Sequence, residues 1–456
     1  MNYADALRFL DSHMNREAVP SIAAGRIDDL SLEPMRKLLS VLGDPHRAYP
    51  AVHVTGTNGK GSVVRMVAEL LRSSGVVTGR YTSPHLQTIN ERLWWSGDPM
   101  VRLDKDGDQV ATEGGLLPGI ISNDALAAML TDLAQLEPLS GVTPSWFETF
   151  TAAAFAWFAE VPVDAAVVEV GLLGRFDATN VIEAPVAVIT NIGGDHTDFS
   201  DGWREKVAWE KAGIVHESSF LVLGENDPEL LPIFTEVAGD RLWRLEHDFD
   251  LIENSVAVGG RMVSIRTPGG VYDDLFVPAH GAHQGDNAAL AIAAVEAFFA
   301  RPLDEAVVNE AFERVRLPGR FEVVARNPLM VIDGAHNAEA AGSVRETLDD
   351  DFAVRGRRIF VIGVLDGRDP RAFLEALDVS SADLLVACAP AWHRALPAER
   401  LGEIAETFGV TVEVVPSVVH AVARAQAYAD AEDVIVITGS FYVAGEARNA
   451  LGLPPA

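Results

Sequence analysis

The stretch AVHVTGTNGKGSVVRMVAELLRS (residues 51–73) decides the fold prediction. It opens with AVHVT, an apolar run rich in β-branched residues that predicts a buried strand over 51–55. Residues 61–73 carry apolar side chains at helical spacing and predict a helix. A glycine-rich turn that joins a strand to a helix suits phosphate binding, because backbone N–H groups and the positive helix end face the ligand.

The turn itself carries the residue types that a phosphate site needs. Lys60 can reach terminal phosphates, and the Ser62 hydroxyl can ligate Mg²⁺. The common phosphate-loop pattern has four residues between its first glycine and the Gly-Lys pair, whereas here only Thr57 and Asn58 intervene. The strand–loop–helix context therefore supports the site although the general pattern fails. The alternative is a tight glycine-rich turn without a ligand.

Composition limits the class of protein. The chain has 456 residues, 36 Lys and Arg against 66 Asp and Glu, and hence a formal net charge of −30. Nucleic acid and anionic membranes are poor partners for so acidic a surface. A single cysteine, Cys388, excludes an internal disulfide and fits a reducing compartment. The N-terminus lacks signal-peptide features and no apolar run is long enough to span a bilayer, so we expect a cytoplasmic protein.

Alternating strands and helices predict an α/β fold. We expect a mostly parallel, phosphate-loop-type sheet domain over residues 1–316, with a small antiparallel excursion at 249–277 where Gly-Gly turns separate short segments. Leu317-Pro318-Gly319-Arg320 marks a boundary. A second, Rossmann-like α/β domain is expected over 317–456. Residues 98–120 are polar and glycine-rich and predict a surface insertion.

Further candidate residues follow the predicted strands, where an open α/β sheet binds its ligands. Each also has a simpler structural interpretation: a strand-end charge, a structural histidine, a helix C-terminal charge, a helix cap or a hinge arginine. The candidates that follow strands are Glu169, the pair Asp195-His196 and the turn Asp333-Gly334-Ala335-His336-Asn337. Three further candidates lie elsewhere: Lys211 near the end of a predicted helix, Asn287 at the start of a helix, and Arg320 at the boundary. Only five basic residues are lysine, so Lys60 and Lys211 stand where arginine is otherwise preferred.

Taken together, these segments resemble the folylpolyglutamate synthase/dihydrofolate synthase family of the Mur ligase superfamily. The resemblance covers nearly the whole chain in order, and that superfamily uses the shortened phosphate loop. The matching segments are HVTGTNGKGSV (53–63), SPHL (83–86), NER (90–92), FETFTAAAF (147–155), EVGLLGRFDATNV (169–181), DH (195–196), WEKAGI (209–214), HQGDNAALA (283–291), PGRFE (318–322), DGAHN (333–337) and TGSFYVAGE (438–446).

The resemblance implies a reaction in which ATP phosphorylates a folate carboxylate and the amine of L-glutamate displaces the phosphate. The implied acceptors are dihydropteroate, reduced folates or both, and the implied state is a monomer. The implied ATP-binding residues are Thr57, Asn58, Gly59, Lys60, Gly61, Ser62, Asn287, Arg320, Asp333 and His336. Two Mg²⁺ sites are implied, formed by Ser62, Ser83, Glu169, His196 and Lys211, with Lys211 resembling the lysine that the family carbamylates. The implied catalytic residues are Lys60, Glu169, His196 and Lys211.

Some features depart from the family pattern or leave alternatives open. Leu365-Asp366-Gly367-Arg368-Asp369 lacks the family's lysine, and His393 and Arg394 are weak candidates for the glutamate site. We expect a positive funnel of Lys60, Arg80, Arg92, Arg175 and Arg320 despite the acidic surface. The alternatives are a kinase or NTPase that stops at phosphoryl transfer, another Mur-type carboxylate–amine ligase, and a paralogue that only binds.

Overall fold

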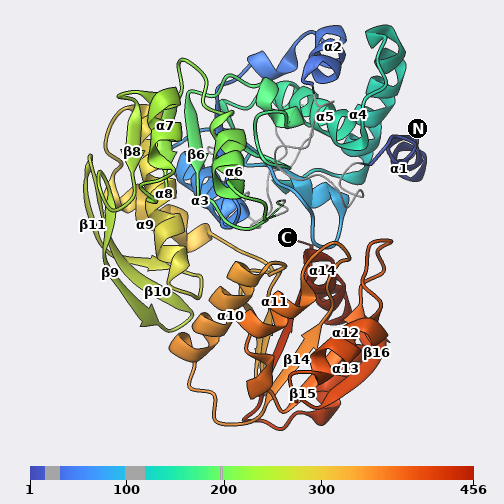
Figure 1. Cartoon of the computed structure of the whole chain (residues 1–456). Coiled ribbons are helices and arrows are strands. Elements are labelled where there is room, and N and C mark those ends of the chain that lie inside the picture. Colours follow the sequence, from blue (N-terminus) through green and yellow to red (C-terminus); the bar gives the residue numbers. More distant parts are fainter. Residues whose placement is uncertain (16–30, 98–118, 196, 198, 456) are drawn as a thin grey trace, which may run out of the picture.

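The computed structural model describes residues 1–15, 31–97, 119–195, 197 and 199–455. Its largest element is an eight-stranded sheet in the order β4-β3-β2-β5-β1-β6-β7-β8 (Figure 1). The strands are β1 (Ala51–Thr55), β2 (Thr78–Tyr81), β3 (Leu93–Trp95), β4 (Gly119–Ile120), β5 (Ala165–Glu169), β6 (Val186–Ile189), β7 (Phe220–Leu223) and β8 (Leu242–Arg244). Strands β2, β5, β1, β6, β7 and β8 are parallel, and β3 and β4 extend the sheet antiparallel.

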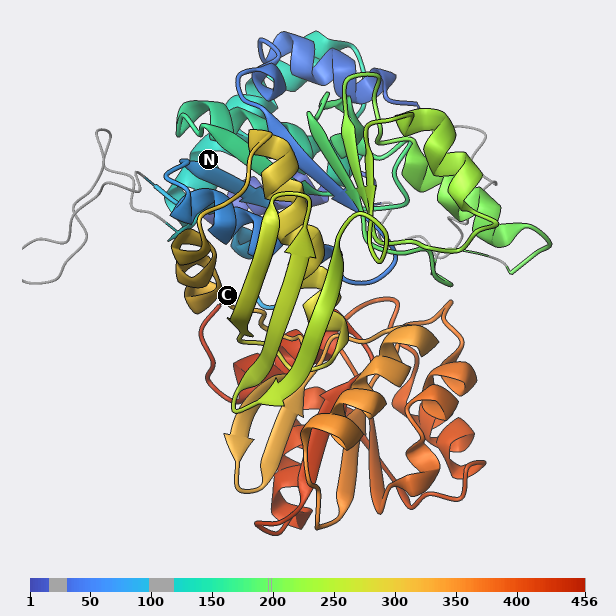
Figure 2. The same ribbon diagram turned by 90° about the vertical axis from the view of Figure 1, so that its left-hand side faces the viewer.

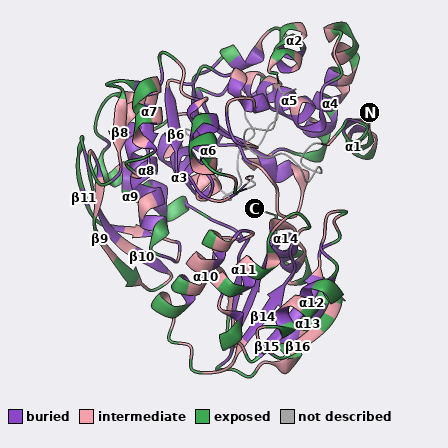
Figure 3. Ribbon diagram, in the orientation of Figure 1, coloured by how far each residue is buried: buried purple, intermediate pink, exposed green. Residues whose placement is uncertain are grey.

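Helices cover both faces of this sheet, which explains why every residue of β1 and β5 is buried (Figure 3). One face packs on α3 (Lys60–Ser73), α8 (His283–Phe299) and α9 (Glu305–Arg314). The other face packs on α1 (Tyr3–Asp11), α2 (Glu33–Val41), α4 (Asn123–Leu136), α5 (Trp146–Glu160), α6 (Trp203–Ala212) and α7 (Leu231–Ala238). Two apolar layers fix the sheet, so its strand ends form a rigid edge for a site.

A three-stranded antiparallel sheet follows, in the order β11-β10-β9. Its strands are β9 (Asp250–Ala257), β10 (Gly260–Thr267) and β11 (Gly270–Val277). Val263, Ile265 and Tyr272 of this sheet join the apolar core beside α8. Figure 2 shows the sheet reaching from the first part of the chain toward the last part.

The C-terminal part is a six-stranded sheet in the order β12-β13-β17-β14-β15-β16, parallel except for β12. The strands are β12 (Glu322–Arg326), β13 (Leu329–Ile332), β14 (Arg358–Ile362), β15 (Leu384–Ala389), β16 (Val412–Ser417) and β17 (Val434–Thr438). The helices are α10 (Ala338–Asp351), α11 (Pro370–Ala376), α12 (Ala398–Glu406), α13 (Val418–Tyr428) and α14 (Phe441–Ala450). Separate apolar clusters fill the two faces.

The α/β class, the parallel sheet, the antiparallel excursion and the second α/β sheet are confirmed. The sequence analysis missed the short strands β3, β4, β7, β8 and β12 and the helices α1, α2, α4 and α7. The expected insertion at 98–120 lies outside the described residues except for 119–120, which form β4. Within the described part of the chain, no helix combines the length and the apolarity that crossing a membrane requires.

Candidate active site

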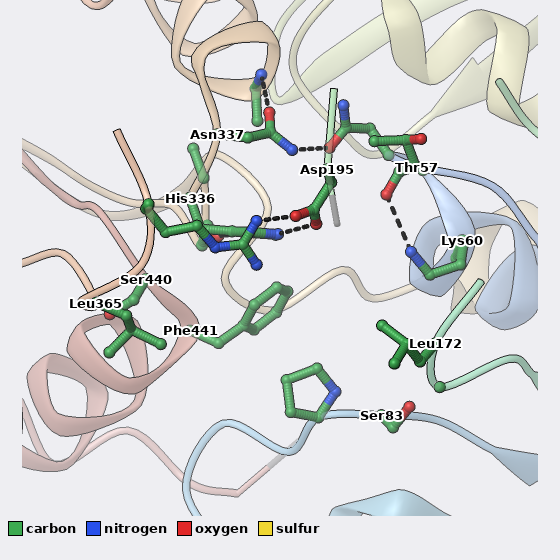
Figure 4. A pocket seen from close by; sticks show the side chains of 18 of the residues that line it. Thr57, Lys60, Ser83, Leu172, Asp195, His336, Asn337, Leu365, Ser440 and Phe441 are labelled. Carbon is green, nitrogen blue, oxygen red and sulfur yellow. Dashed lines mark hydrogen bonds and ion pairs between the residues drawn. The ribbon is translucent and has the colours of Figure 1, made fainter. Parts of the chain in front are cut away.

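A cavity of about 670 Å³ lies between the eight-stranded and the six-stranded parts (Figure 4). The first part contributes the phosphate loop, the ends of β5 and β6 and the start of α8. The C-terminal part contributes the turn after β13, the loop after β14 and the start of α14. The carboxyl ends of parallel strands from two sheets therefore face one space, as expected for ligand sites of open α/β sheets.

The phosphate loop is held by the segment that follows β6. Asn191 Oδ1 accepts hydrogen bonds from the backbone N–H groups of Thr57 and Asn58, at 3.1 and 2.9 Å. Gly56 and Gly59 have φ of 147° and 83°, which a residue with a side chain rarely adopts. The N-terminus of α3, with Lys60 as its first residue, consequently faces the cavity as an anion site.

Lys60 lies in the cavity and folds back on the loop. Its Nζ donates to the carbonyls of Gly56 and Thr57 at 3.0 and 2.9 Å. Burial lowers the pKa of Lys60, and the nearby Glu169 carboxylate opposes that shift. The amine is therefore poised to exchange two carbonyl contacts for a phosphate.

Glu169 ends β5 beside the phosphate loop. Its Oε2 accepts the Ser83 backbone N–H at 3.2 Å, and Ser62, Ser83 and Glu169 line the same cavity. Burial raises the pKa of Glu169, while Lys60 and the Ser83 hydrogen bond lower it. One carboxylate and two hydroxyls form an oxygen-rich set of the kind that Mg²⁺ prefers.

The two other expected metal ligands are His196 and Lys211. His196 lies outside the described residues. Lys211 is buried at the end of α6, next to the cavity-lining Glu210, and does not line the cavity itself. Burial, reinforced by Lys60, holds the pKa of Lys211 well below its usual value. Among the described residues, no cluster of three His, Cys, Asp or Glu side chains can hold a metal ion.

The turn after β13 supplies the facing wall. Asp333 accepts the backbone N–H groups of Phe321 and Ala335, both at 2.7 Å, and burial raises its pKa against the effect of Arg320. His336 Nδ1 lies 3.0 Å from the Gly334 carbonyl, and burial lowers the pKa of His336 to about 4. The N-cap of α10 is Asn337, so capping of this helix does not explain Asp333 and His336.

Asn287 and Arg320 also line the cavity. Asn287 donates to Gln284 Oε1 at 3.0 Å, and a Cβ on Gly59 would lie 2.5 Å from Asn287 Oδ1. Arg320 stacks over Phe441, 4.3 Å from the ring centre. The structure thus brings together the predicted ATP-contacting residues of both parts of the chain.

The expected positive funnel is wrong in its composition. Three of its arginines stack on tryptophans away from the cavity lining: Arg80 on Trp94, Arg92 on Trp146 and Arg175 on Trp209. The cationic residues that line the cavity are Lys60, Arg320, Arg368 and Arg394.

Arg368 was missed as a site residue. It pairs with Asp195 across the cavity, and His336 Nε2 lies 3.4 Å from the same carboxylate (Figure 4). Its position directly after a central strand of a parallel sheet was the available signal. Of the weak glutamate-site candidates, Arg394 lines the cavity and His393 does not.

Known proteins match almost the whole chain. The dihydrofolate synthase/folylpolyglutamate synthase of Mycobacterium tuberculosis is 39% identical, over 94% of this chain and 91% of the relative. The chain belongs to the dihydrofolate synthase/folylpolyglutamate synthase family. The Bacillus subtilis member is 32% identical, over 91% of this chain and 94% of its own length. Residues 149–295 match the Mur ligase middle domain, and residues 319–441 match the Mur ligase glutamate ligase domain.

Solved structures of this ligase family share the fold. The Mycobacterium tuberculosis folylpolyglutamate synthase complexed with ADP is 35% identical with a TM-score of 0.87, covering 100% of this chain and 99% of that one. A bifunctional folylpolyglutamate synthase/dihydrofolate synthase with Mn, AMPPNP and L-glutamate bound is 27% identical, with a TM-score of 0.80 and coverage of 99% and 98%. The expected family, fold class and ligase chemistry are confirmed.

Proposed function

We propose that this protein joins L-glutamate to dihydropteroate, to reduced folates or to both, with ATP as the energy source. The observation that carries the proposal is the shared cavity: a phosphate loop on one wall and the Asp333–His336 turn on the other. Two substrates and a nucleotide must meet in one enclosed space for a carboxylate to be phosphorylated and then captured by an amine. The family relatives named for both activities support this choice of substrates.

The reaction begins with a poor electrophile. Transfer of the γ-phosphoryl group to a folate carboxylate forms an acyl phosphate and releases ADP. Two anions approach one another in this step, so the positive end of α3 and the Lys60 and Arg320 side chains are needed to offset their repulsion. The glutamate amine then adds to the acyl carbon, loses a proton, and expels phosphate as the amide forms.

The residues present fit a divalent metal beside the phosphates. Ser62, Ser83 and Glu169 line the cavity together and would hold it, with His196 and Lys211 as the further ligands we predict. When bound, Mg²⁺ supplies charge neutralisation for the phosphates. The protein's own part is to fix Glu169 through the Ser83 N–H and to hold Lys60 at the phosphate loop through the Gly56 and Thr57 carbonyls.

Lys211 has the properties that carbamylation requires. Its buried, lowered pKa favours the neutral amine, which forms a C–N bond to carbon dioxide and releases a proton. The product is a carboxylate-like ligand that arginine cannot provide. We therefore assign Lys211 as a carbamylated ligand of the second metal.

We retain three further proposals from the sequence. The chain divides into units at residues 1–316 and 317–456, acts as a monomer, and works in the cytoplasm. The single cysteine, buried Cys388, agrees with a reducing compartment. A kinase or NTPase, the alternative from the sequence, would use the same phosphate loop for transfer to water or a hydroxyl, but the curated relatives support the ligase.

One assay separates these possibilities. Phosphate release from MgATP and L-glutamate is measured with dihydropteroate, with tetrahydrofolate and without an acceptor, while product mass is recorded. We expect release only with an acceptor and glutamate together, with the product heavier by one glutamyl residue. Release without glutamate would favour the NTPase, and a phosphorylated product that is stable would favour the kinase.

A further inference from the structure

A buried ion pair lies outside the cavity lining, at the end of α10, whose residue Thr347 lines the cavity. Asp351, the last residue of α10, receives Arg261 Nη1 of β10 on its Oδ1 at 2.6 Å. The Asp351 side chain is 0% exposed and that of Arg261 is 7% exposed. The pair joins the C-terminal part of the chain to the three-stranded sheet (Figure 2).

The same carboxylate also holds the loop that leads into α8. Asp351 Oδ2 accepts the Gly281 backbone N–H at 2.9 Å, and His280 Nδ1 lies 3.4 Å from it. From the sheet side, Asn254 donates to the Ala282 carbonyl at 2.9 Å and accepts Arg261 Nε at 2.7 Å. Asp351 therefore contacts residues 280–281 directly, and Arg261 supports residue 282 through Asn254.

The loop of residues 280–282 lies very close to α10. Gly281 has φ of 94°, and a Cβ there would lie 2.6 Å from Thr347 Oγ1 of α10. No side chain fits between the loop and the helix. The close contact between Gly281 and Thr347 thus fixes the distance between α8 and α10.

Both helices line the cavity just beyond this contact. The lining residues are His283, Gln284 and Asn287 on α8, and Ala338, Ala340, Ser343, Val344 and Thr347 on α10. Because Asn287 adjoins Gly59 of the phosphate loop, a nucleotide bound there by its phosphates would have its nucleoside part between these two helices. The distance between α8 and α10 consequently determines the fit of its nucleoside part.

Helix stability does not explain an aspartate at this position. A negative charge at a helix C-terminus opposes the helix dipole, and the last turn of α10 has no basic residue. A buried ion pair also contributes little net stability compared with apolar residues. The contact has a geometric consequence instead.

We propose that Asp351 and Arg261 are positioning residues that set the spacing of α8 and α10 and thereby the affinity for the nucleotide. The proposal rests on the ATP-dependent function above, so its test measures nucleotide binding directly as well as turnover. Failure of the ligase assay with intact nucleotide binding would refute that function and leave this inference standing.

The test compares D351N with D349N. The amide introduced by D351N would keep an oxygen for the Gly281 N–H but lose the charge that holds Arg261. Asp349 lies on the same last turn and pairs with Arg358 of its own sheet at 2.6 Å, which makes D349N the matched control. We expect the Kd for ADP and the KM for ATP to rise about tenfold in D351N, while its KM for glutamate stays within about twofold of the wild type. In D349N, the Kd for ADP and the KM for ATP should both stay within about twofold of the wild type.

A double variant separates positioning from stability. R261M/D351L removes both buried charges, which restores or raises the unfolding temperature relative to D351N. We expect its nucleotide affinity to stay about tenfold low, and R261K, which keeps a cation for Asp351, to recover most of the affinity. Recovery of affinity together with stability in the double variant, or wild-type affinity in D351N, would overturn the proposal.

Discussion

At the scale of single residues, the two buried lysines of the site differ in what surrounds them. Lys60 shares its environment with the Glu169 carboxylate and donates to two carbonyls, which support a charged amine. Lys211 is buried beside Lys60, and both effects lower its pKa well below the usual value against the opposing effect of the Glu210 carboxylate. The same side chain is thus suited to phosphate binding at one position and to carbamate formation at the other.

This difference predicts that K211R abolishes turnover. Arginine keeps a positive charge at neutral pH and cannot form the carbamate, so we expect kcat to fall by at least about 100-fold. Lys206 is the matched control, because it is exposed on the same helix and bonds Ser200 Oγ at 3.0 Å. K206R should keep activity within about twofold, and intact-protein labelling with ¹³C-bicarbonate should give a carbamate signal in the wild type and in K206R but not in K211R. Wild-type turnover by K211R would exclude a ligand role.

Residue chemistry made Lys60, Glu169, Asp333 and His336 predictable, because each follows a strand and carries the group that the site needs. Arg368 was not predictable as a partner of Asp195, because the pair joins loops about 170 positions apart on different sheets. Arg80, Arg92 and Arg175 were misassigned for the opposite reason. Their charge suggested the cavity, whereas nearby tryptophan rings hold them elsewhere.

At the scale of elements, the conformation of the phosphate loop requires a residue without a side chain at Gly56, both for its backbone angle and for its close approach to Thr190. A Cβ on Gly56 would overlap Thr190 Oγ1, which itself donates to the Asn58 carbonyl at 2.6 Å. The φ of 147° at Gly56 adds strain to any substitution. The turn from β1 to α3 therefore packs directly against Thr190, the residue that follows β6.

We expect G56A to weaken nucleotide binding by at least about tenfold in calorimetric titration with ADP, because the loop must move off Thr190. Gly342 gives the matched glycine control, since a Cβ within α10 at that position meets nothing within 4 Å. G342A should bind ADP normally and unfold at a higher temperature, by about 1 kcal/mol of added stability. Unchanged binding by G56A would show that the loop tolerates a side chain.

A second element-level prediction concerns strand β1 and acid. His53 is fully buried, its Nε2 lies 2.8 Å from Thr179 Oγ1, and burial lowers the pKa of His53 to about 3. The unfolded chain takes up the proton near pH 6.5, so stability is present above that value and is lost as the pH falls toward 3. From pH 7 to pH 5 this histidine alone should remove about 2 kcal/mol.

The H53Q variant tests this assignment. Glutamine keeps a hydrogen-bonding side chain near Thr179 but does not titrate, so its denaturation midpoint should fall less between pH 7 and pH 5 than that of the wild type. His247, which is exposed, supplies the matched surface-histidine control H247Q. Parallel pH profiles for H53Q and wild type would contradict a neutral buried His53.

Element prediction succeeded where apolar runs were long and bounded by glycine, as in β1, β5 and β17. It failed for β3 and β4, which have three and two residues and pair antiparallel at one edge. Such short edge strands are defined by their neighbour on the sheet and not by a local pattern. Strand β7 is four residues long, too short for periodicity to separate it from a buried helix segment.

At the scale of the whole molecule, the site exists only when the two parts of the chain are correctly placed. Contacts cross between them at several points: Arg368 to Asp195, Glu339 to the Gly194 N–H at 2.9 Å, and Gln87 to Asn449 at 2.9 Å. None of these pairs is close in sequence, so the sequence did not predict what holds the two walls of the cavity together.

The closest of these approaches lies between α14 and the loop after β2. A Cβ on Gly445 would overlap the Leu86 carbonyl oxygen, a backbone atom that cannot rotate away. G445A should therefore separate the two parts at this edge and displace Ser440 and Phe441, which line the cavity from the start of α14. A displacement near ~1 Å is expected to lower kcat about 100-fold while ADP binding to the phosphate loop weakens much less. G342A again serves as the control, and steady-state kinetics with calorimetric ADP titration provide the measurement. Equal losses of kcat and nucleotide affinity would indicate general destabilisation, whereas a selective loss of kcat would show that Gly445 permits the approach of the two walls that catalysis requires.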